Sequence, residues 1–300
     1  MLPRWRKCER RAKLLAGFTY IFPEFKENLP LADRSLVSWQ RLSQANEGGP
    51  IPLSAIFLIA LRLLELGLAS AAFAVLLSED GYLREDDWED LLIRDVSILR
   101  VHKDSPPQVG LPLGPSERGG TAKTGPDQGV IVDTPLLRWW IYYLAQLKDP
   151  EERPVTLTSH EFRKIWWRTL DDLGLTYFGP PHSLRHSRPS ADASAGLDLE
   201  SIRRRGRWAS LKSVQRYTKG HLLIKQTARM GQALHRRAEA YLQDPGKALA
   251  GALSRLLART GSVSPSSAAG CPFVLSLSRA ISRVRHSPYR EPIRPAPQNT

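Results

Sequence analysis

The stretch Ile51–Leu77 constrains the fold most, because it is the most apolar part of this 300-residue chain. Arg62 and Glu65 interrupt it. It therefore falls short of the roughly 18 uninterrupted apolar residues that a membrane-spanning helix needs. We expect one or two buried core helices here, bent near Gly67, and no membrane segment.

The charge of the chain is strongly positive and unevenly distributed. It carries 43 Lys and Arg against 30 Asp and Glu, a formal net charge of +13. Part of the excess lies in residues 246–300, but Ser201–Arg237 also holds eleven Lys or Arg and no acid. That segment is patterned as helices, whereas acids collect at Glu79–Asp95. A balance of this kind favours a polyanionic partner, of which nucleic acid is the commonest.

The number and spacing of cysteines exclude a disulfide-stabilised protein and a zinc-finger protein. The chain has two cysteines, Cys8 and Cys271, one in each poorly patterned end. Neither a disulfide framework nor a zinc-ligand spacing is present. We expect a reducing compartment, a site without metal, and no cofactor.

The segment His182–Tyr217 combines residues that suit attack on a phosphodiester. It contains a His-x-x-Arg pair (His182, Arg185), a Gly-Arg-Trp turn ending at Trp208, and Tyr217 nine positions later. The segment resembles the second conserved motif of the tyrosine recombinases, the phage-integrase family. That motif reads His-x-x-Arg, a variable helix, Gly-x-His/Trp, and a nucleophilic tyrosine.

Two further residues extend the resemblance. Arg84 stands three residues before Asp87, as the arginine of the family's first motif stands before a glutamate. The alternative is an acidic helix start whose arginine pairs with its neighbours. Lys123 lies in a Pro/Gly-rich segment before Val130–Val132, where the family places its catalytic lysine on a hairpin. The alternative is a solvated loop lysine.

The resemblance covers about residues 51–240 and implies a mainly α fold with a small antiparallel β-sheet. It also implies cleavage and rejoining of DNA through a phosphotyrosyl intermediate, without cofactor. The implied catalytic residues are Arg84 and Arg185 as phosphate clamp, Lys123 as general acid, His182 as base or proton shuttle, Trp208 as positioning donor, and Tyr217 as nucleophile. Three alternatives stay open. The functional histidine could be His186 instead of His182. Trp208 could be a core residue, and Tyr217 could be an ordinary buried tyrosine.

The partner implied is double-stranded DNA, bound by a homodimer or tetramer in the nucleus or nucleoid-associated cytoplasm and not secreted. The activity would be site-specific recombination or integration of a mobile element. Alternatives are an inactive descendant that binds DNA or assembles on it, and a type IB topoisomerase. Basic residues expected to contact DNA are Arg203, Arg204, Arg205, Arg207, Lys212 and Arg216.

We expect three regions: an N-terminal remnant of a DNA-binding arm or helical domain at 1–49, a catalytic domain at 50–245, and a basic, mostly disordered tail at 246–300. Pro189 is expected in the first turn of its helix, and Gly206 is expected to end the next one. The predicted elements are a strand at Val96–Val101, a hairpin at Val130–Val132, helices over 134–148, 158–173, 187–195, 198–205 and 221–241, and a helix after Ser210 that carries Tyr217.

Overall fold

The computed structural model describes residues 20–23, 49–102, 105–114, 128–243, 248 and 251–252. Contacts between residues divide the chain into two compact units, Met1–Glu47 and Gly48–Thr300. Only residues 20–23 of the first unit are described, so the fold below is that of the second unit. Lys123 and almost all of the tail predicted at 246–300 lie outside the described residues.

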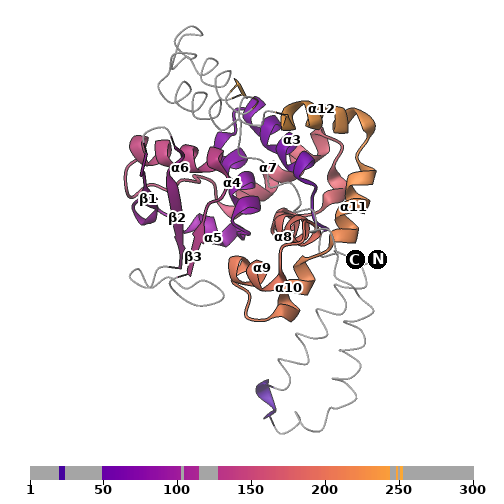
Figure 1. Cartoon of the computed structure of the whole chain (residues 1–300), viewed down its shortest axis with the longest axis horizontal. Coiled ribbons are helices and arrows are strands. Elements are labelled where there is room, and N and C mark those ends of the chain that lie inside the picture. The colour runs from indigo at the N-terminus through magenta and orange to yellow at the C-terminus, as the bar shows by residue number, and fades with distance from the viewer. Residues whose placement is uncertain are drawn as a thin grey trace, which may run out of the picture. The chain divides into compact units, whose positions relative to one another are not determined.

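The second unit is mainly α-helical with one three-stranded antiparallel sheet, as the sequence predicts (Figure 1). Its centre is a pair of helices, α3 (Leu53–Glu65) and α4 (Ala69–Asp80), whose side chains are mostly buried. Gly67 lies between them with a φ of 82°, a backbone conformation that glycine adopts without steric cost. The apolar stretch is therefore two core helices. In the described part of the chain no helix is long and apolar enough to cross a membrane.

The sheet follows the short helix α5 (Glu85–Glu89) and a 3-10 turn at Ile93–Asp95. Its strands are β1 (Ser97–Leu99), β2 (Gln108–Leu113) and β3 (Gln128–Ile131), in the order β1-β2-β3. β1 is shorter than predicted, because the Val96 N–H donates to the Ile93 carbonyl at 3.1 Å and so closes the turn. The segment containing Lys123 connects β2 to β3.

Two helices cover this core, and both begin where their sequences predict. Thr134 precedes α6 (Pro135–Leu147), which has proline in its first turn, and Trp140 of α6 packs on Phe73 with ring centroids 5.2 Å apart. α7 (Ser159–Asp172) begins with a capping box. Its Thr158 N–H donates to Glu161 Oε2 at 2.9 Å. The capping prediction is confirmed.

The next helix begins earlier than predicted. A 3-10 turn at Pro181–Ser183 runs directly into α8 (Leu184–Ser194), so Pro189 lies inside the helix and not in its first turn. The two prolines at 180–181 preset the helical φ, and the Ser183 N–H bonds the Pro180 carbonyl at 2.9 Å. Arg185 is consequently a helical residue whose direction is set by the first turn of α8.

Two short helices follow, α9 (Leu199–Gly206) and α10 (Leu211–Tyr217). Asp198 caps α9 by accepting from Ser201 N at 2.8 Å, and Ser210 caps α10, as predicted. The end of α9 was predicted wrongly. Gly206 is still helical, and Arg207 adopts the left-handed conformation, with a φ of 56°.

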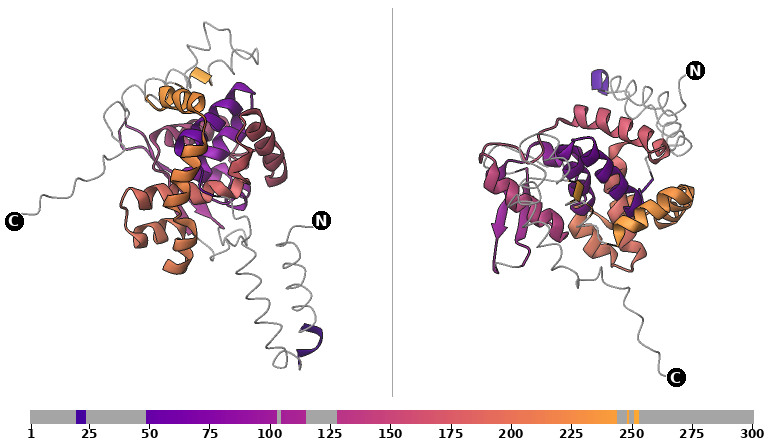
Figure 2. Two further views of the ribbon diagram at one scale, coloured as in Figure 1. Left: turned by 90° about the vertical axis from the view of Figure 1, so that its right-hand side faces the viewer. Right: turned by 90° about the horizontal axis from the view of Figure 1, so that it is seen from above.

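The single helix predicted at 221–241 is instead two helices, α11 (Gly220–Arg229) and α12 (Gln232–Leu242). Met230 and Gly231 between them are extended, and Met230 is buried beside Ser54. This change of direction lets α12 pack against α3 of the same chain (Figure 2). Amphipathic periodicity does not reveal the break, because the anchor for Met230 comes from a distant helix.

Candidate functional site

Tyr217, at the end of α10, is enclosed by two aromatic rings. Its ring stacks on His186 of α8 at a centroid distance of 4.5 Å and on Trp208 at 4.6 Å. The Tyr217 carbonyl accepts a hydrogen bond from Ser190 Oγ at 2.8 Å, which joins α10 to α8. In Figure 1, α8, α9 and α10 lie together, and each contacts the other two. The half-buried Tyr217 ring is thus held from both faces.

Arg185 lies behind this ring and is almost completely buried, with 1% of its surface exposed. Its Nη2 donates to the Gly206 carbonyl at 3.0 Å, and its Nη1 donates to the Tyr82 carbonyl. Its guanidinium carbon is 5.4 Å from the Trp208 ring centre and 5.7 Å from that of Tyr217. Burial, followed by the charge of a neighbouring arginine, lowers the pKa of Arg185 below its usual value.

Two guanidiniums, those of Arg185 and Arg207, share one carboxylate, and the charge of a third arginine, Arg84, lies near both. Asp87 Oδ2 lies 3.5 Å from both Arg185 Nη1 and Arg207 Nη2, and accepts the Arg84 backbone N–H at 2.8 Å. The charge of Arg84 lowers the pKa of both Arg185 and Arg207, although burial is the larger cause for each. The cluster keeps an excess of positive charge, which suits an oxyanion such as a phosphate.

The two histidines of the motif have different environments. His182 is exposed, and its ring centre is 6.2 Å from Tyr217 and 5.4 Å from His186. His186 is 2% exposed, and burial, then the charges of Lys219 and His182, lower its pKa to about 3. His186 is therefore a neutral ring at ordinary pH, unsuited to moving protons near neutrality.

Trp208 is both a core residue and a neighbour of Tyr217. It is 4% exposed and belongs to a small apolar cluster with Tyr82, Ile202 and Val214. Its ring folds back over Gly206, where an added Cβ would lie 2.1 Å from Trp208 Cζ3. Glycine is therefore required at 206 for close approach of the indole and not for an unusual φ.

Three buried polar atoms around the Tyr217 ring have no hydrogen-bond partner among the described residues: Arg185 Nε, His186 Nδ1 and Trp208 Nε1. Buried polar groups are nearly always paired, so three together need an explanation. Two of them, on Arg185 and Trp208, are N–H donors in any state. A bound oxyanion would satisfy donors of this kind.

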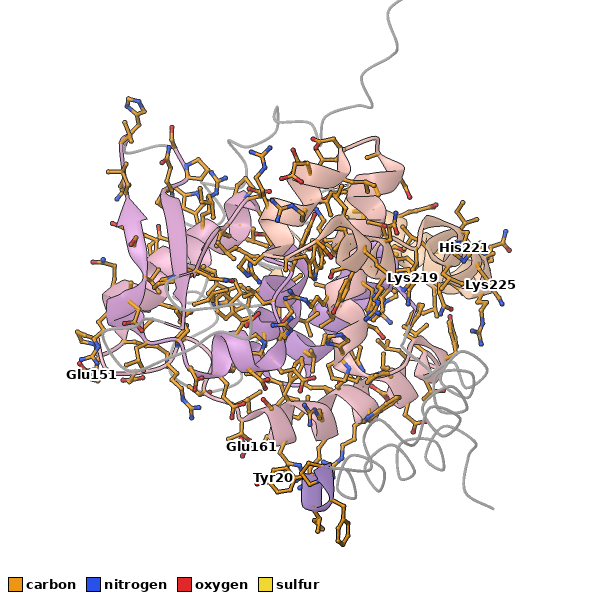
Figure 3. All side chains as sticks on the ribbon, turned by 90° about the horizontal axis from the view of Figure 1, so that it is seen from below. Tyr20, Glu151, Glu161, Lys219, His221 and Lys225 are labelled. Carbon is orange, nitrogen blue, oxygen red and sulfur yellow. The ribbon has the colours of Figure 1, made fainter. Side chains whose placement is uncertain are left out.

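The basic residues predicted to contact DNA fall into two groups. Arg203 donates to the Trp208 carbonyl at 2.9 Å, Arg205 pairs with Asp133 and donates to the Asp80 carbonyl, and Arg207 binds inside the arginine cluster. The other three are exposed: Arg204, Lys212 and Arg216. Figure 3 places Lys219, His221 and Lys225 close together at one edge of the molecule.

The structure thus brings together Arg84, Arg185, His182, Trp208 and Tyr217. Lys123 lies outside the described residues, so the structure does not test its place in this group. Sequence reasoning missed Tyr82, whose carbonyl receives the Arg185 guanidinium, and it missed the contacts of Arg207 inside the cluster. In the sequence, the spacing of Arg84 and Asp87 was the one hint of an arginine cluster near Tyr82. No sequence pattern identifies a backbone carbonyl as a binding partner.

A buried ionic network lies beneath the site and affects stability. Glu79, 5% exposed, pairs with Arg188 at 3.4 Å, and Arg188 bonds Asp192, which accepts from the Tyr82 hydroxyl. Burial, opposed by Arg188 and reinforced by Asp80 and Asp192, raises the pKa of Glu79 to about 7.

This raised pKa predicts a pH-dependent stability. Between about pH 4.5 and 7 the folded state binds more protons at Glu79 than the unfolded state, so stability falls as pH rises through that window. We expect Glu79→Gln to remove on the order of 3 kcal/mol of this decline. Urea unfolding at pH 5 and pH 8 measures it, with the exposed Glu239→Gln as control. Equal pH dependence of wild type and Glu79→Gln would contradict the assignment.

No family model and no curated protein matches the chain. Among solved structures, the chain is similar to the crystal structure of XerA recombinase, with 14% sequence identity and a TM-score of 0.41. That similarity covers 77% of this chain and 81% of the XerA chain.

Proposed function

We propose that this protein cleaves and rejoins a strand of duplex DNA through a covalent bond between Tyr217 and a 3′-phosphate, as tyrosine recombinases do. One observation supports it above all. The Tyr217 ring has the Arg185 guanidinium 5.7 Å from its centre, the exposed His182 ring 6.2 Å away and the Trp208 indole stacked on it at 4.6 Å.

The Tyr217 hydroxyl oxygen attacks the phosphorus, the bond to the 5′-oxygen breaks, and the phenol proton passes to His182. Arg84 and Arg185 neutralise the charge on the non-bridging oxygens, and the leaving oxygen takes a proton from Lys123. The role of Lys123 rests on its position in the sequence. Because the phosphotyrosyl bond retains the energy of the phosphodiester, rejoining needs no cofactor.

His182 suits the proton-transfer role better than His186. The ring of His182 is exposed to solvent, whereas the buried His186 has a pKa of about 3 and stacks face to face on the phenol. A stacked ring does not point its nitrogens at the hydroxyl. We assign His186 the role of holding the Tyr217 ring in place.

Duplex DNA would lie across the exposed basic residues, which include Arg204, Lys212 and Arg216. Binding through phosphates should weaken steeply with salt. Strand exchange would require two or four copies of the chain on DNA. Recombination or integration of a mobile element, in the nucleus or the nucleoid-associated cytoplasm, is the context that we propose.

Tyr217→Phe provides the decisive test. We expect wild-type protein, incubated with nicked suicide duplexes from its flanking genomic DNA, to form a protein–DNA adduct on a denaturing gel. Tyr217→Phe keeps the ring stacking and removes the nucleophile, so it should form no adduct while binding DNA as well as wild type. An adduct that persists in Tyr217→Phe would contradict the assignment of the nucleophile.

A second candidate is a DNA-binding descendant that does not cleave. The observation that favours it is the burial of Arg185, whose two terminal nitrogens already donate to the carbonyls of Tyr82 and Gly206. A wild-type protein that binds duplexes in a salt-dependent manner but yields no adduct on any flanking duplex would support this candidate.

A further inference from the structure

We propose that Arg207 is a positioning residue that orients Arg185 and completes a site for one tetrahedral oxyanion, formed by Arg84, Arg185, Arg207 and Asp87. The inference deepens the proposed function, because the scissile phosphate would occupy this site. It adds a third arginine that acts through its neighbours. The site itself exists whether or not the protein cleaves DNA.

The backbone provides the first reason. Tyr82 and Arg207, with φ values of 52° and 56°, are the non-glycine residues with positive φ in the described part of the chain. Such conformations are strained and persist where the surroundings enforce them. Glycine or asparagine usually occupies the position after a helix where Arg207 stands. The two strained residues also contact each other, through the Arg207 guanidinium and the Tyr82 carbonyl.

The side chain of Arg207 provides the second reason. It donates to the carbonyls of Gly81, at 3.3 Å, and Tyr82, at 3.3 Å, and reaches Asp87 Oδ2 at 3.5 Å. Arg185 binds the same Tyr82 carbonyl and the same Asp87 oxygen. Two guanidiniums thus share two oxygens, and Arg207 limits how Arg185 can turn.

Because Arg207 limits how Arg185 can turn, the Nε–H of Arg185 points in one fixed direction. With Nη1 and Nη2 engaged, its Nε–H remains without a partner among the described residues, as does the Trp208 Nε1–H. Both donors lie beside a cluster in which the Arg185 and Arg207 guanidiniums share the Asp87 carboxylate and the charge of Arg84 acts on both arginines. A phosphate group would accept from these donors and relieve the repulsion between the arginines.

Phosphate binding to the DNA-free protein tests the proposal. Thermal unfolding is measured with millimolar inorganic phosphate, at constant ionic strength set with chloride, for wild type, Arg207→Gln and Arg207→Lys. Arg168→Gln is the matched control, because Arg168 is an exposed arginine of α7 outside the cluster. We expect phosphate to raise the Tm of wild type and Arg168→Gln alike.

Both Arg207 variants should bind phosphate about tenfold or more weakly, since lysine keeps the charge but cannot hold several oxygens in a fork. If Arg207→Gln does not fold, Arg207→Lys decides the outcome. Wild-type phosphate affinity in Arg207→Lys would overturn the proposal, and so would an absence of phosphate stabilisation in wild type. Because no DNA is cleaved in this assay, failure here is distinguishable from failure of the Tyr217 adduct test.

Discussion

Alanine at Gly206 is expected to destabilise the protein by about 2 kcal/mol, although alanine normally favours a helix over glycine by about 1 kcal/mol. The substitution lowers stability because of the Trp208 ring, since the new Cβ would lie 2.1 Å from Cζ3 and 2.2 Å from Cε3 of that ring. The indole must therefore leave its position on Gly206. Urea unfolding measures the loss of stability.

The same displacement should disturb the site. Trp208 stacks on Tyr217 at 4.6 Å, so a shifted indole no longer holds the nucleophile's ring. A displacement of about 1 Å can cost on the order of 100-fold in rate, and we expect a loss of adduct formation of that size. Gly231→Ala is the control, because an added Cβ at Gly231 meets nothing within 4 Å. Equal stability of the two variants would show that the indole has room to move.

Truncation of Arg185 is expected to have the larger effect on stability. Arg185→Ala leaves the carbonyls of Tyr82 and Gly206 without their donor and Asp87 without one of its cations, all in a buried setting. Removing one partner of a buried ion pair typically costs about 3–5 kcal/mol. Chemical denaturation should show a loss of this order.

Arg185→Lys separates charge from geometry in the same experiment. Lysine retains a positive charge but lacks the planar fork that reaches two carbonyls, so we expect adduct formation to fall by about 100-fold or more even where the variant folds. Arg204→Ala serves as the control and should change stability by less than about 0.5 kcal/mol. Adduct formation at the wild-type rate in Arg185→Lys would refute the role of the guanidinium as phosphate clamp.

Local sequence signals predicted a large part of the fold. Thr158, Asp198 and Ser210 each mark a helix start, because their side chains accept from the backbone N–H three residues later. Gly67 separates the two core helices because glycine adopts the positive φ that the turn between them requires. The candidate nucleophile and its motif were also found from spacing along the chain, through resemblance to a family.

Signals that depend on distant contacts were missed. The helix predicted at 221–241 breaks at Met230, because Met230 is anchored beside Ser54 of α3. The end of α9 lies at Arg207 and not at Gly206, since contacts of the Arg207 side chain with Gly81 and Tyr82 accompany the strained backbone. Helical periodicity and glycine positions carry no information about these partners.

Patterns in the sequence alone predicted that the chain is mainly helical, that its longest apolar stretch forms the core, and which tyrosine lies among basic residues. Those features depend on neighbours within a few positions. Tertiary contacts were needed to show that Arg185 is buried on the Tyr82 carbonyl, that His186 is a neutral stacking ring, and that Arg207 shares Asp87 with Arg185. Burial and charge proximity decide such roles, and both arise when segments about a hundred residues apart in the sequence pack together.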